Sequence, residues 1–321
     1  MKSAAFLFPG QGAQVLGMAV DLVEACPQAR AVFDRGREIL GFDVLGVCRD
    51  GPADELNSTR VSQPAIFLDS MALLEVLGDR AGACGTGYGT GLAAAAAAGL
   101  SLGEYSALVF AGSLTFDDAL NLVARRGEYM QEACDAEKGS MASILGLDAP
   151  RVEEEVDRAT AARHRVGIAN YNSPAQTVIS GSEESVAETA ERLKAAGARR
   201  VVMLPVAGAY HSSLMGEATR KMKPLLEEVP IQPPRIPFYG NYEGGAVSDP
   251  EAIRRGLILQ IENPVRWHQS MQALLATGVR SALEVGPGRV IQGLLRGIER
   301  AFEVRSIADL ETLDNVEVVP V

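Results

Sequence analysis

The spacing of apolar and polar positions predicts an alternation of strands and helices along the chain. A short apolar run at 3–8 predicts a buried strand, which ends at a Pro-Gly pair. Apolar residues then recur at helical spacing over 17–40. A further helix is predicted to begin at Gln63, with Pro64 in its first turn, where a proline loses no hydrogen bond. The chain therefore begins as a strand followed by helices.

An alanine-rich run at 92–99 predicts the next strand, although alanine is a poor strand former. The prediction rests on the residues after the run, because a helical pattern resumes directly after Ser101. Another helix is predicted at 116–133, where Asp117 and Asp118 favour the positive N-terminal end. The alternation of strand and helix indicates a mostly parallel α/β sheet.

Residues 138–205 are predicted to form a small unit of their own. Its strands are expected at 140–147, 166–171, 176–181 and 198–206, and its helices at 149–163 and 182–197. Ser182 is expected to cap the second of these helices. The order strand-helix-strand-strand-helix-strand is the split ferredoxin-like pattern.

The remainder of the chain returns to the larger pattern. Its elements are a helix from Ser212, a strand near 236–240, helices at 250–262 and 268–277, a strand at 281–286 and a helix after Pro287. The predicted fold class is therefore α/β. Residues 1–137 and 206–321 would form one large domain, and 138–205 would be a small domain inserted in it.

Composition narrows the class of protein. The chain has 321 residues, a net charge of -11 and a pI near 4.9, which argues against a nucleic-acid-binding protein. Cys26, Cys48, Cys84 and Cys134 are widely spaced and form no Cys-x-x-Cys pair, so reduced thiols in the cytoplasm are expected. With three histidines and no Cys/His cluster, no structural zinc site is expected.

Three segments argue against other classes of protein. The apolar run at 3–8 is too short for a signal peptide. No segment approaches the roughly 20 apolar residues of a membrane span, so no membrane partner is expected. The glycine-rich segment 82–91 lacks the Gly-Lys-Ser/Thr of a phosphate-binding loop, and a flexible loop is predicted there in place of a nucleotide site.

Candidate chemistry centres on the sequence Gly-x-Ser-x-Gly at 99–103. A serine between two glycines at a sharp strand-to-helix turn is the pattern of a nucleophile elbow. The amides of the following helix would face a developing oxyanion. The alternative is a serine that only caps the helix. The alanine-rich strand before Ser101 and the helix after it favour the nucleophile.

A serine hydroxyl is a weak nucleophile and needs a base. His211 follows a predicted strand and its loop, which is where sites gather in α/β sheets, and it is the favoured base. His164 stands among charges at a helix end and is expected to be solvated. His268 opens a helix, as a cap or a structural group. With 41 acidic residues, spacing selects no Asp or Glu to orient the base.

Eight motifs occur in the order found in the malonyl-CoA:acyl-carrier-protein transacylases, and the chain resembles that family from residue 5 to about 307. The motifs are FPGQGAQ (8–14), SQPA (62–65), GLSLGEYSALVFAG (99–112), RRGEYMQEA (125–133), IANYNSPAQTVISG (168–181), PVAGAYHSSLM (205–215), NPVRW (263–267) and EVGPG (284–288). The resemblance implies an α/β-hydrolase-like domain that carries a ferredoxin-like subdomain. It also implies malonyl transfer for fatty-acid or polyketide synthesis.

The resemblance implies a role for each of several residues. Ser101 would attack the thioester carbonyl of malonyl-CoA, and His211 would take its proton and return it to the leaving thiol. The main-chain carbonyl of Gln260 would orient the histidine, so that no acidic residue is needed. The backbone amides of Gln11 and Leu102 would form the oxyanion hole.

The resemblance also implies how the substrate is recognised. Arg126 would hold the free malonyl carboxylate with its guanidinium fork. By helical pattern alone, Arg125 and Arg126 are both expected to be exposed, and the motif selects Arg126. Gln63 would lie near the acyl chain, and Asn170 and Asn172 would face the thioester arm.

The chain departs from the family pattern at two positions. Leu100 precedes the serine where most members have histidine, and this residue is not the general base. Tyr210 precedes His211 where malonyl-selective members usually have phenylalanine and methylmalonyl-selective ones often have serine. A large aromatic side chain disfavours an α-branched acyl group on steric grounds, so malonyl is the predicted substrate.

The resemblance implies a ping-pong transfer from CoA to Ser101 and then to the phosphopantetheine thiol of acyl carrier protein, by a monomer without a metal or a tightly bound cofactor.

Acyl carrier proteins are acidic, and this chain is acidic too, so docking of the carrier requires a local basic patch. Candidate patches are Arg199-Arg200, Arg220-Lys221-Lys223 and Arg254-Arg255. For each, a solvated helix face is the alternative.

Three other functions stay open at this point. An editing hydrolase or esterase on the same fold is disfavoured by Arg126, because an esterase has no use for a carboxylate clamp. A non-catalytic homologue is disfavoured because Ser101, His211, Gln11 and Arg126 are all present. A stand-alone acyltransferase of a polyketide synthase is not distinguished by sequence.

Overall fold

The computed structural model describes residues 4–82, 88 and 92–316, and the strands within them form two separate sheets. The larger sheet contains, in spatial order, β10 (Glu303–Ile307), β9 (Ser281–Val285), β1 (Ala4–Phe8), β2 (Ala94–Gly99), β7 (Phe238–Gly240) and β8 (Gly245–Val247). Neighbouring strands run parallel except β7 and β8, which are antiparallel. The predicted α/β class with a mostly parallel sheet is therefore confirmed.

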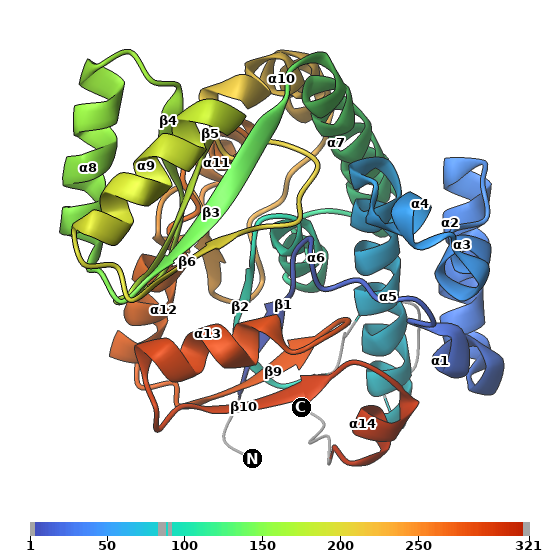
Figure 1. Ribbon diagram of the computed structural model, residues 1–321. Helices are drawn as coiled ribbons and strands as arrows, with labels where there is room; N and C mark the ends of the chain where they lie inside the picture. The colour runs from blue at the N-terminus through green and yellow to red at the C-terminus, as the bar shows by residue number, and fades with distance from the viewer. Residues whose placement is uncertain (1–3, 83–87, 89–91, 317–321) are drawn as a thin grey trace.

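Helices pack against the larger sheet and in an outer layer beyond it (Figure 1). They are α1 (Val20–Ala25), α2 (Pro27–Leu40), α3 (Val44–Asp50), α4 (Ala53–Asn57), α5 (Thr59–Arg80), α6 (Gly103–Phe110), α7 (Phe116–Ala136), α10 (Gly216–Glu228), α11 (Pro250–Gln260), α12 (Trp267–Ala276), α13 (Val290–Ile298) and α14 (Leu310–Asp314). The termini of the described chain lie near one edge of this arrangement (Figure 1).

The side chains of β1 show why both faces of the sheet are covered. Successive side chains of a strand point to opposite faces. Phe6 and Phe8 join the core that includes α5, α6 and α7, whereas Ala5 and Leu7 join the core that includes α12 and α13. Every residue of β1 is buried, and the alanines of β2 divide between the two cores in the same way. A continuous apolar run is therefore what a central parallel strand requires.

The smaller sheet has the order β4-β5-β3-β6, with every neighbouring pair antiparallel. Its elements are β3 (Gly139–Leu145), α8 (Ala149–Ala161), β4 (Val166–Ser173), β5 (Gln176–Ser182), α9 (Glu183–Ala195) and β6 (Arg200–Met203). This is the predicted split ferredoxin-like order, and α8 and α9 lie on one side of the sheet (Figure 1). Main-chain bonds between Ala169 or Tyr171 and Val265 join it to the larger part of the chain. The limits 138–205 of the insert stay a prediction.

The structure gives the bounds of two predicted helical regions, in both cases at a proline. The helical patterns predicted over 17–40 form two helices, α1 and α2, which meet at extended Cys26, because the residue before Pro27 is disfavoured in helical conformation. The next helix begins at Thr59, so that Pro64 lies inside α5 and not in its first turn. Packing of a helix that is buried on nearly every side compensates the hydrogen bond that the proline removes.

Ser182 stands at the N-cap position of α9, as expected, but makes no capping bond to a backbone amide. Its hydroxyl donates instead to Ser185 Oγ, 2.8 Å away. The pattern also gave no indication of α3, α4, β8, β10 or α14, which are short elements of three to seven residues. Most of the glycine-rich segment 82–91 lies outside the described residues.

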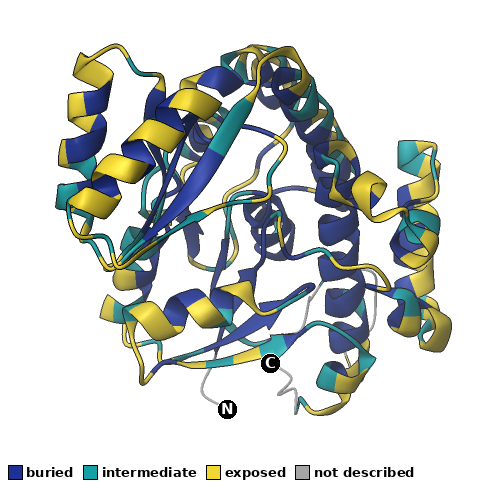
Figure 2. Cartoon of the chain, viewed as in Figure 1, coloured by how far each residue is buried: buried dark blue, intermediate teal, exposed yellow. Residues whose placement is uncertain are grey.

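One described helix, α5, is long and apolar enough to cross a membrane by length and composition, contrary to the expectation that no segment approaches such a span. Of its most apolar window, 94% is buried inside the protein. Figure 2 shows α5 dark blue along most of its length, whereas α2 and α8 carry exposed outer faces. The apolar surface of α5 is therefore used in the core.

Candidate active site

Ser101 stands at the turn between β2 and α6 with a backbone φ of 52°, the left-handed region that side chains other than glycine rarely adopt. The glycines on either side are needed for space. A Cβ on Gly99 would lie 1.9 Å from the carbonyl carbon of Gly103, and one on Gly103 would lie 2.1 Å from the carbonyl oxygen of Phe8. The turn is therefore an elbow that holds a strained serine at the end of a strand.

His211 faces the serine from a part of the chain 110 residues away. Its Nε2 lies 2.8 Å from Ser101 Oγ, and its Nδ1 lies 2.7 Å from the main-chain oxygen of Gln260. With Nδ1–H donating to that carbonyl, the lone pair of Nε2 faces the serine hydroxyl. Burial, and then the charge of Arg126, lower the pKa of the His211 imidazole to about 4. The ring is therefore neutral at pH 7 and able to accept a proton.

Arg126 extends from α7 into the same site and is 1% exposed. Its Nη1 donates to Gln63 Oε1 at 2.7 Å, and its Nη2 donates to Gln260 Oε1 at 2.9 Å and to Ser101 Oγ at 3.0 Å. All three acceptors are uncharged oxygens, and burial lowers the pKa of the guanidinium. Among the described residues Arg126 thus has no ion-pair partner, which is a costly state for a buried cation.

The neighbouring Arg125 differs in every respect. Its side chain is 58% exposed and makes an ion pair with Glu128, 2.7 Å away on the next turn of the same helix. Consecutive residues of a helix point in different directions around its axis, so Arg125 faces solvent whereas Arg126 is buried.

The two residues predicted to supply oxyanion-hole amides, Gln11 and Leu102, stand on segments that follow neighbouring strands. Leu102 is the residue after Ser101 at the start of α6, and Gln11 follows β1, the strand beside β2. Within the part of the chain that the structure describes, neither amide donates a hydrogen bond. Gly10 permits the close approach of the two segments, because a Cβ there would lie 2.3 Å from the carbonyl oxygen of Leu100.

The hydroxyl of Tyr210 lies in a polar cluster with Thr59 and Gln11. It lies 2.5 Å from Thr59 Oγ1 and accepts a bond from Gln11 Nε2 at 3.1 Å. Gln63 Nε2 donates to Gln11 Oε1 at 3.4 Å, which links the cluster to the partner of Arg126. The hydroxyl that distinguishes Tyr210 from a phenylalanine is thus satisfied by fixed protein groups.

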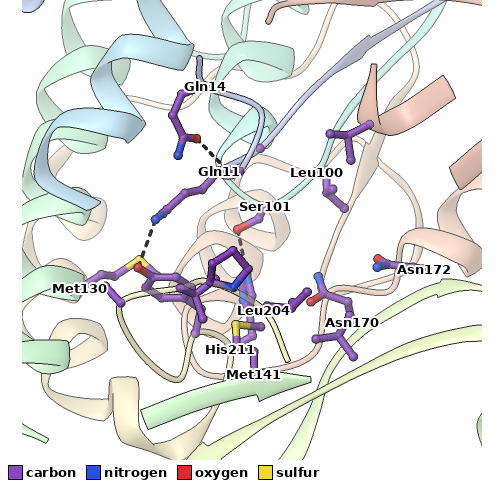
Figure 3. A pocket seen from close by; sticks show the side chains of 18 of the residues that line it. Gln11, Gln14, Leu100, Ser101, Met130, Met141, Asn170, Asn172, Leu204 and His211 are labelled. Carbon is purple, nitrogen blue, oxygen red and sulfur yellow. Dashed lines mark hydrogen bonds between the residues drawn. The ribbon is translucent and has the colours of Figure 1, made fainter. Parts of the chain in front are cut away.

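These residues meet at a cavity of about 700 Å³ between the two sheets. Asn170 and Asn172 line it from β4 of the smaller sheet, across from Ser101 and His211 (Figure 3). Leu100 lines it beside the serine. The lining further includes Gly10, Gln11, Arg126, Met130, Met141, Leu204, Val206, Tyr210, Val290 and Leu294. An elongated substrate could therefore contact both sheets at once.

The other two histidines do not line this cavity. His164 was expected to be solvated, but its side chain is 23% exposed and its Nε2 lies 3.3 Å from Glu188 Oε2. His268 is half-buried in α12 and is not the cap, since Arg266 holds the N-cap position. Burial lowers the pKa of the His268 imidazole.

Sequence reasoning missed two polar residues beneath the serine, Glu104 and Asn241. Glu104 is 2% exposed, and burial raises the pKa of its carboxyl to about 8, against the opposing effect of hydrogen bonds from Asn241 and Gln260. Asn241 is 1% exposed and follows β7 directly. A polar residue at the carboxyl end of a parallel strand was the available signal for Asn241. Glu104 had none beyond its closeness to Ser101 in the chain.

Comparisons with known proteins agree with this geometry. The model of the acyl transferase domain family matches residues 5–316. The chain is 38% identical over 314 residues to the malonyl CoA-acyl carrier protein transacylase of Bacillus subtilis, covering 98% of this chain and 96% of that protein. It is 40% identical over 298 residues to the corresponding protein of Escherichia coli, covering 93% of each.

Solved structures give the same result. An acyl carrier protein S-malonyltransferase from Vibrio cholerae superposes with a TM-score of 0.90 at 37% identity, covering 99% of this chain and 100% of that one. A malonyl-transacylase in complex with its type II polyketide synthase acyl-carrier protein also superposes with a TM-score of 0.90 at 37% identity, covering 98% of each chain.

Proposed function

The chain belongs to the acyl transferase domain family, and from that membership and the site geometry we propose that it is a malonyl-CoA:acyl carrier protein transacylase. It transfers malonyl from CoA to Ser101 as an ester, and then to the phosphopantetheine thiol of an acyl carrier protein. The observation that carries the proposal is the buried, unpaired guanidinium of Arg126 beside a serine–histidine pair.

In the first half-reaction, Ser101 Oγ attacks the thioester carbonyl of malonyl-CoA while its proton passes to His211 Nε2. The 2.8 Å separation and the neutral imidazole support this transfer. The amides of Gln11 and Leu102 would bind the oxyanion of the tetrahedral intermediate. When the carbon–sulfur bond breaks, His211 returns the proton to the CoA thiolate, and the malonyl ester remains on Ser101.

Arg126 binds the free carboxylate of the malonyl group in this proposal. A guanidinium that is buried without a counter-ion gains most from an anionic ligand, because its desolvation is already complete. Gln63 and Gln260 hold its two Nη atoms in place. An uncharged acyl group would leave the cation unpaired, so malonyl is selected over acetyl.

Tyr210 selects against a branch on the acyl group. Its ring lines the cavity next to His211, and its hydroxyl is tied to Thr59 and Gln11. A side chain held by two polar partners cannot easily move aside for the extra methyl of methylmalonyl.

In the second half-reaction, the thiol of phosphopantetheine enters the cavity that CoA has left. His211 takes the thiol proton as the sulfur attacks the ester carbonyl, and returns it to Ser101 Oγ when the ester bond breaks. Asn170 and Asn172 face the arm of either thiol from the smaller sheet. Similarity to a transacylase solved in complex with its acyl-carrier protein supports such a partner.

We further propose that the enzyme is a cytoplasmic monomer that supplies fatty-acid synthesis and needs no bound metal or cofactor. Free thiols at Cys26, Cys48 and Cys134 favour a reducing compartment. Supply of a polyketide synthase is the alternative pathway, because the complex to which the chain is similar contains a polyketide carrier.

Incubation with malonyl-CoA, methylmalonyl-CoA or acetyl-CoA, followed by intact mass measurement, tests the function. We expect one malonyl adduct per chain, none in Ser101→Ala, and little adduct from the other two thioesters. Arg126→Ala should slow malonyl loading by about 10- to 100-fold, the worth of a charge-assisted bidentate contact.

Arg125→Ala is the matched control, because it removes the adjacent, exposed arginine and should leave loading unchanged. An acetyl adduct of equal yield would contradict the role of Arg126. Release of malonate to water in the presence of a carrier thiol would favour the editing hydrolase or esterase.

A further inference from the structure

The buried carboxyl group of Glu104 lies beneath the serine elbow. Glu104 is in the first turn of α6, three residues after Ser101, and points into the protein. Its Oε1 accepts the backbone N–H of Asn241 at 2.8 Å, and its Oε2 accepts from Gln260 Nε2. Both oxygens are therefore occupied by donors from segments that are more than 130 residues distant in the chain.

The first of these partners, Asn241, bridges the elbow. Its Oδ1 accepts the backbone N–H of Ser101 at 2.7 Å, and its Nδ2 donates to the carbonyl oxygen of Gly99 at 2.7 Å. The two bonds bracket Leu100 and anchor the N-terminal side of the strained serine, whose φ is 52°. They oppose relaxation of this residue toward an ordinary backbone conformation, which would turn its hydroxyl away.

The second partner, Gln260, connects the elbow to the base. Its Nε2 also donates to the carbonyl oxygen of Ser101 at 3.0 Å, and its Oε1 accepts from Arg126. Its own carbonyl oxygen accepts from His211 Nδ1. The side chain of Gln260 thus fixes the position of the carbonyl that orients the histidine.

We propose that Glu104 is a positioning residue for acyl transfer, which holds Asn241 against the elbow and Gln260 against His211. One carboxyl group then sets the relative placement of nucleophile and base, although it contacts neither the substrate nor the reacting atoms. The inference rests on the proposed function for the reaction that it serves, whereas the geometry is independent of the substrate.

Two variants separate the two contacts. Glu104→Gln is nearly isosteric but places an amide donor opposite Nε2 of Gln260, so that two N–H groups face each other. Asn241→Ala removes the bridge across the elbow and keeps the main-chain N–H that binds Glu104. The first should disturb both serine and histidine, and the second only the serine.

The experiment combines single-turnover loading by malonyl-CoA with NMR of the ¹⁵N-histidine-labelled enzyme. Only three histidines are present, so the Nδ1–H proton of His211, bonded to a carbonyl, can be identified by its loss in His211→Gln. Loading should fall by about 10- to 100-fold in both variants, the scale for a small misplacement of reacting groups. The His211 signal should shift in Glu104→Gln and stay in Asn241→Ala.

Asp69→Asn is the matched control. Asp69 is a fully buried carboxyl in α5 without a hydrogen-bond partner among the described residues, so its loss tests the general effect of removing a buried acid. Loading and the His211 signal should both remain as in the wild type.

Loading within threefold of wild type in both variants, or an unmoved His211 signal in folded Glu104→Gln, would overturn the proposal. If Glu104→Gln does not fold, Asn241→Ala still decides whether the bridge matters. Failure of the wild type to load malonyl would refute the proposed function instead, and the NMR comparison would still report on the positioning.

Discussion

At the scale of single residues, the site depends on two strained backbones that face each other. Ser101 and His211 have φ values of 52° and 56°, and neither is a glycine. Each such residue costs of order 1–3 kcal/mol and persists only where surrounding contacts enforce it. Here the backbone N–H of Ser101 donates to Asn241 Oδ1, and the His211 ring donates from Nδ1 to the main-chain oxygen of Gln260. The strain fixes the two side chains at hydrogen-bond distance before any substrate arrives.

The depressed pKa of His211 predicts the pH dependence of the reaction. Burial and Arg126 disfavour the imidazolium, so that the ring stays neutral until the pH falls to about 4, well below its usual 6.5. Only the neutral ring can accept the serine proton. The single-turnover loading rate should therefore show no limb near pH 6.5, and should fall about tenfold per pH unit below about 4.

Rapid mixing of enzyme held at pH 7 into acidic malonyl-CoA measures this rate, and far-UV circular dichroism on the same time scale verifies that the protein is still folded. A protonation limb between pH 6 and 7 would contradict the buried, neutral histidine.

The burial of a side chain distinguishes the residues of the active site from other residues of the same type. Arg125 and Arg126 are chemically identical neighbours, yet only Arg126 is enclosed. The same holds for histidines, since His211 is 4% exposed whereas His164 pairs with Glu188 near the surface. Helical periodicity did not predict which of the two arginines is buried, because it gives no information about the elements that pack around the helix.

At the scale of elements, the strand–elbow–helix unit was the most predictable part of the site. Its requirements are local, since two glycines must flank the serine for the chain to turn directly from β2 into α6. Helix ends at prolines were less predictable. Whether Pro64 begins a helix or lies inside one depends on packing around α5, and that is not a local property.

Substitution of Gly103 tests the elbow as a packing element. In Gly103→Ala the new Cβ would lie 2.1 Å from the carbonyl oxygen of Phe8 and 2.7 Å from that of Pro9, so α6 must move away from β1. Overpacking against backbone is expected to lower the free energy of unfolding by about 3 kcal/mol or more. Urea denaturation measures this loss.

Gly293→Ala is the comparison, because this glycine is exposed in α13 and a methyl group added to it would have no neighbouring atom within 4 Å. Alanine is the better helix former, so this variant should gain about 0.5–1 kcal/mol. Equal effects of the two substitutions would contradict a steric requirement at the elbow.

At the scale of the whole molecule, the carrier protein must reach a cavity between two sheets on a chain of net charge -11. The predicted basic patches differ in whether their side chains form ion pairs with acidic residues. Arg220, Lys221, Lys223 and Arg254 all pair with glutamates, and Arg254 also binds main-chain carbonyls. Among the described residues, exposed Arg199 and Arg200 make no ion pair, and β6 leads from them to the cavity wall at Leu204.

We therefore expect Arg199-Arg200 to be the docking patch. The double variant Arg199→Glu, Arg200→Glu should slow transfer to an acidic carrier by about tenfold or more while malonyl loading from CoA stays within twofold. The two half-reactions are measured separately, by intact mass for loading and by carrier acylation for transfer.

The double variant Arg220→Glu, Lys223→Glu changes the net charge equally and is the control, since both side chains are already paired. A parallel fall of both half-reactions in the Arg199-Arg200 variant would exclude docking there, and a larger transfer defect in the control would move the patch to α10.

The order of the main elements, the split ferredoxin-like insert and the serine elbow could all be predicted from the sequence. Each of these features is determined by residues that are close together in the chain. The helices and strands follow from the apolar periodicity within one element, and the elbow follows from glycines within two residues of Ser101. The ordered motifs indicated the family as well, which the comparisons confirm.

Which polar groups meet around Ser101 depends instead on how the chain packs in three dimensions. Glu104 lies in α6, Asn241 in the turn after β7 and Gln260 at the end of α11, and their contacts span more than 130 residues of chain. Such contacts exist because parallel strands end at a common edge and helices pack over it, so side chains that are remote in sequence share one buried volume. Within that volume most buried donors pair with an acceptor, and this tendency selects partners that no local pattern records.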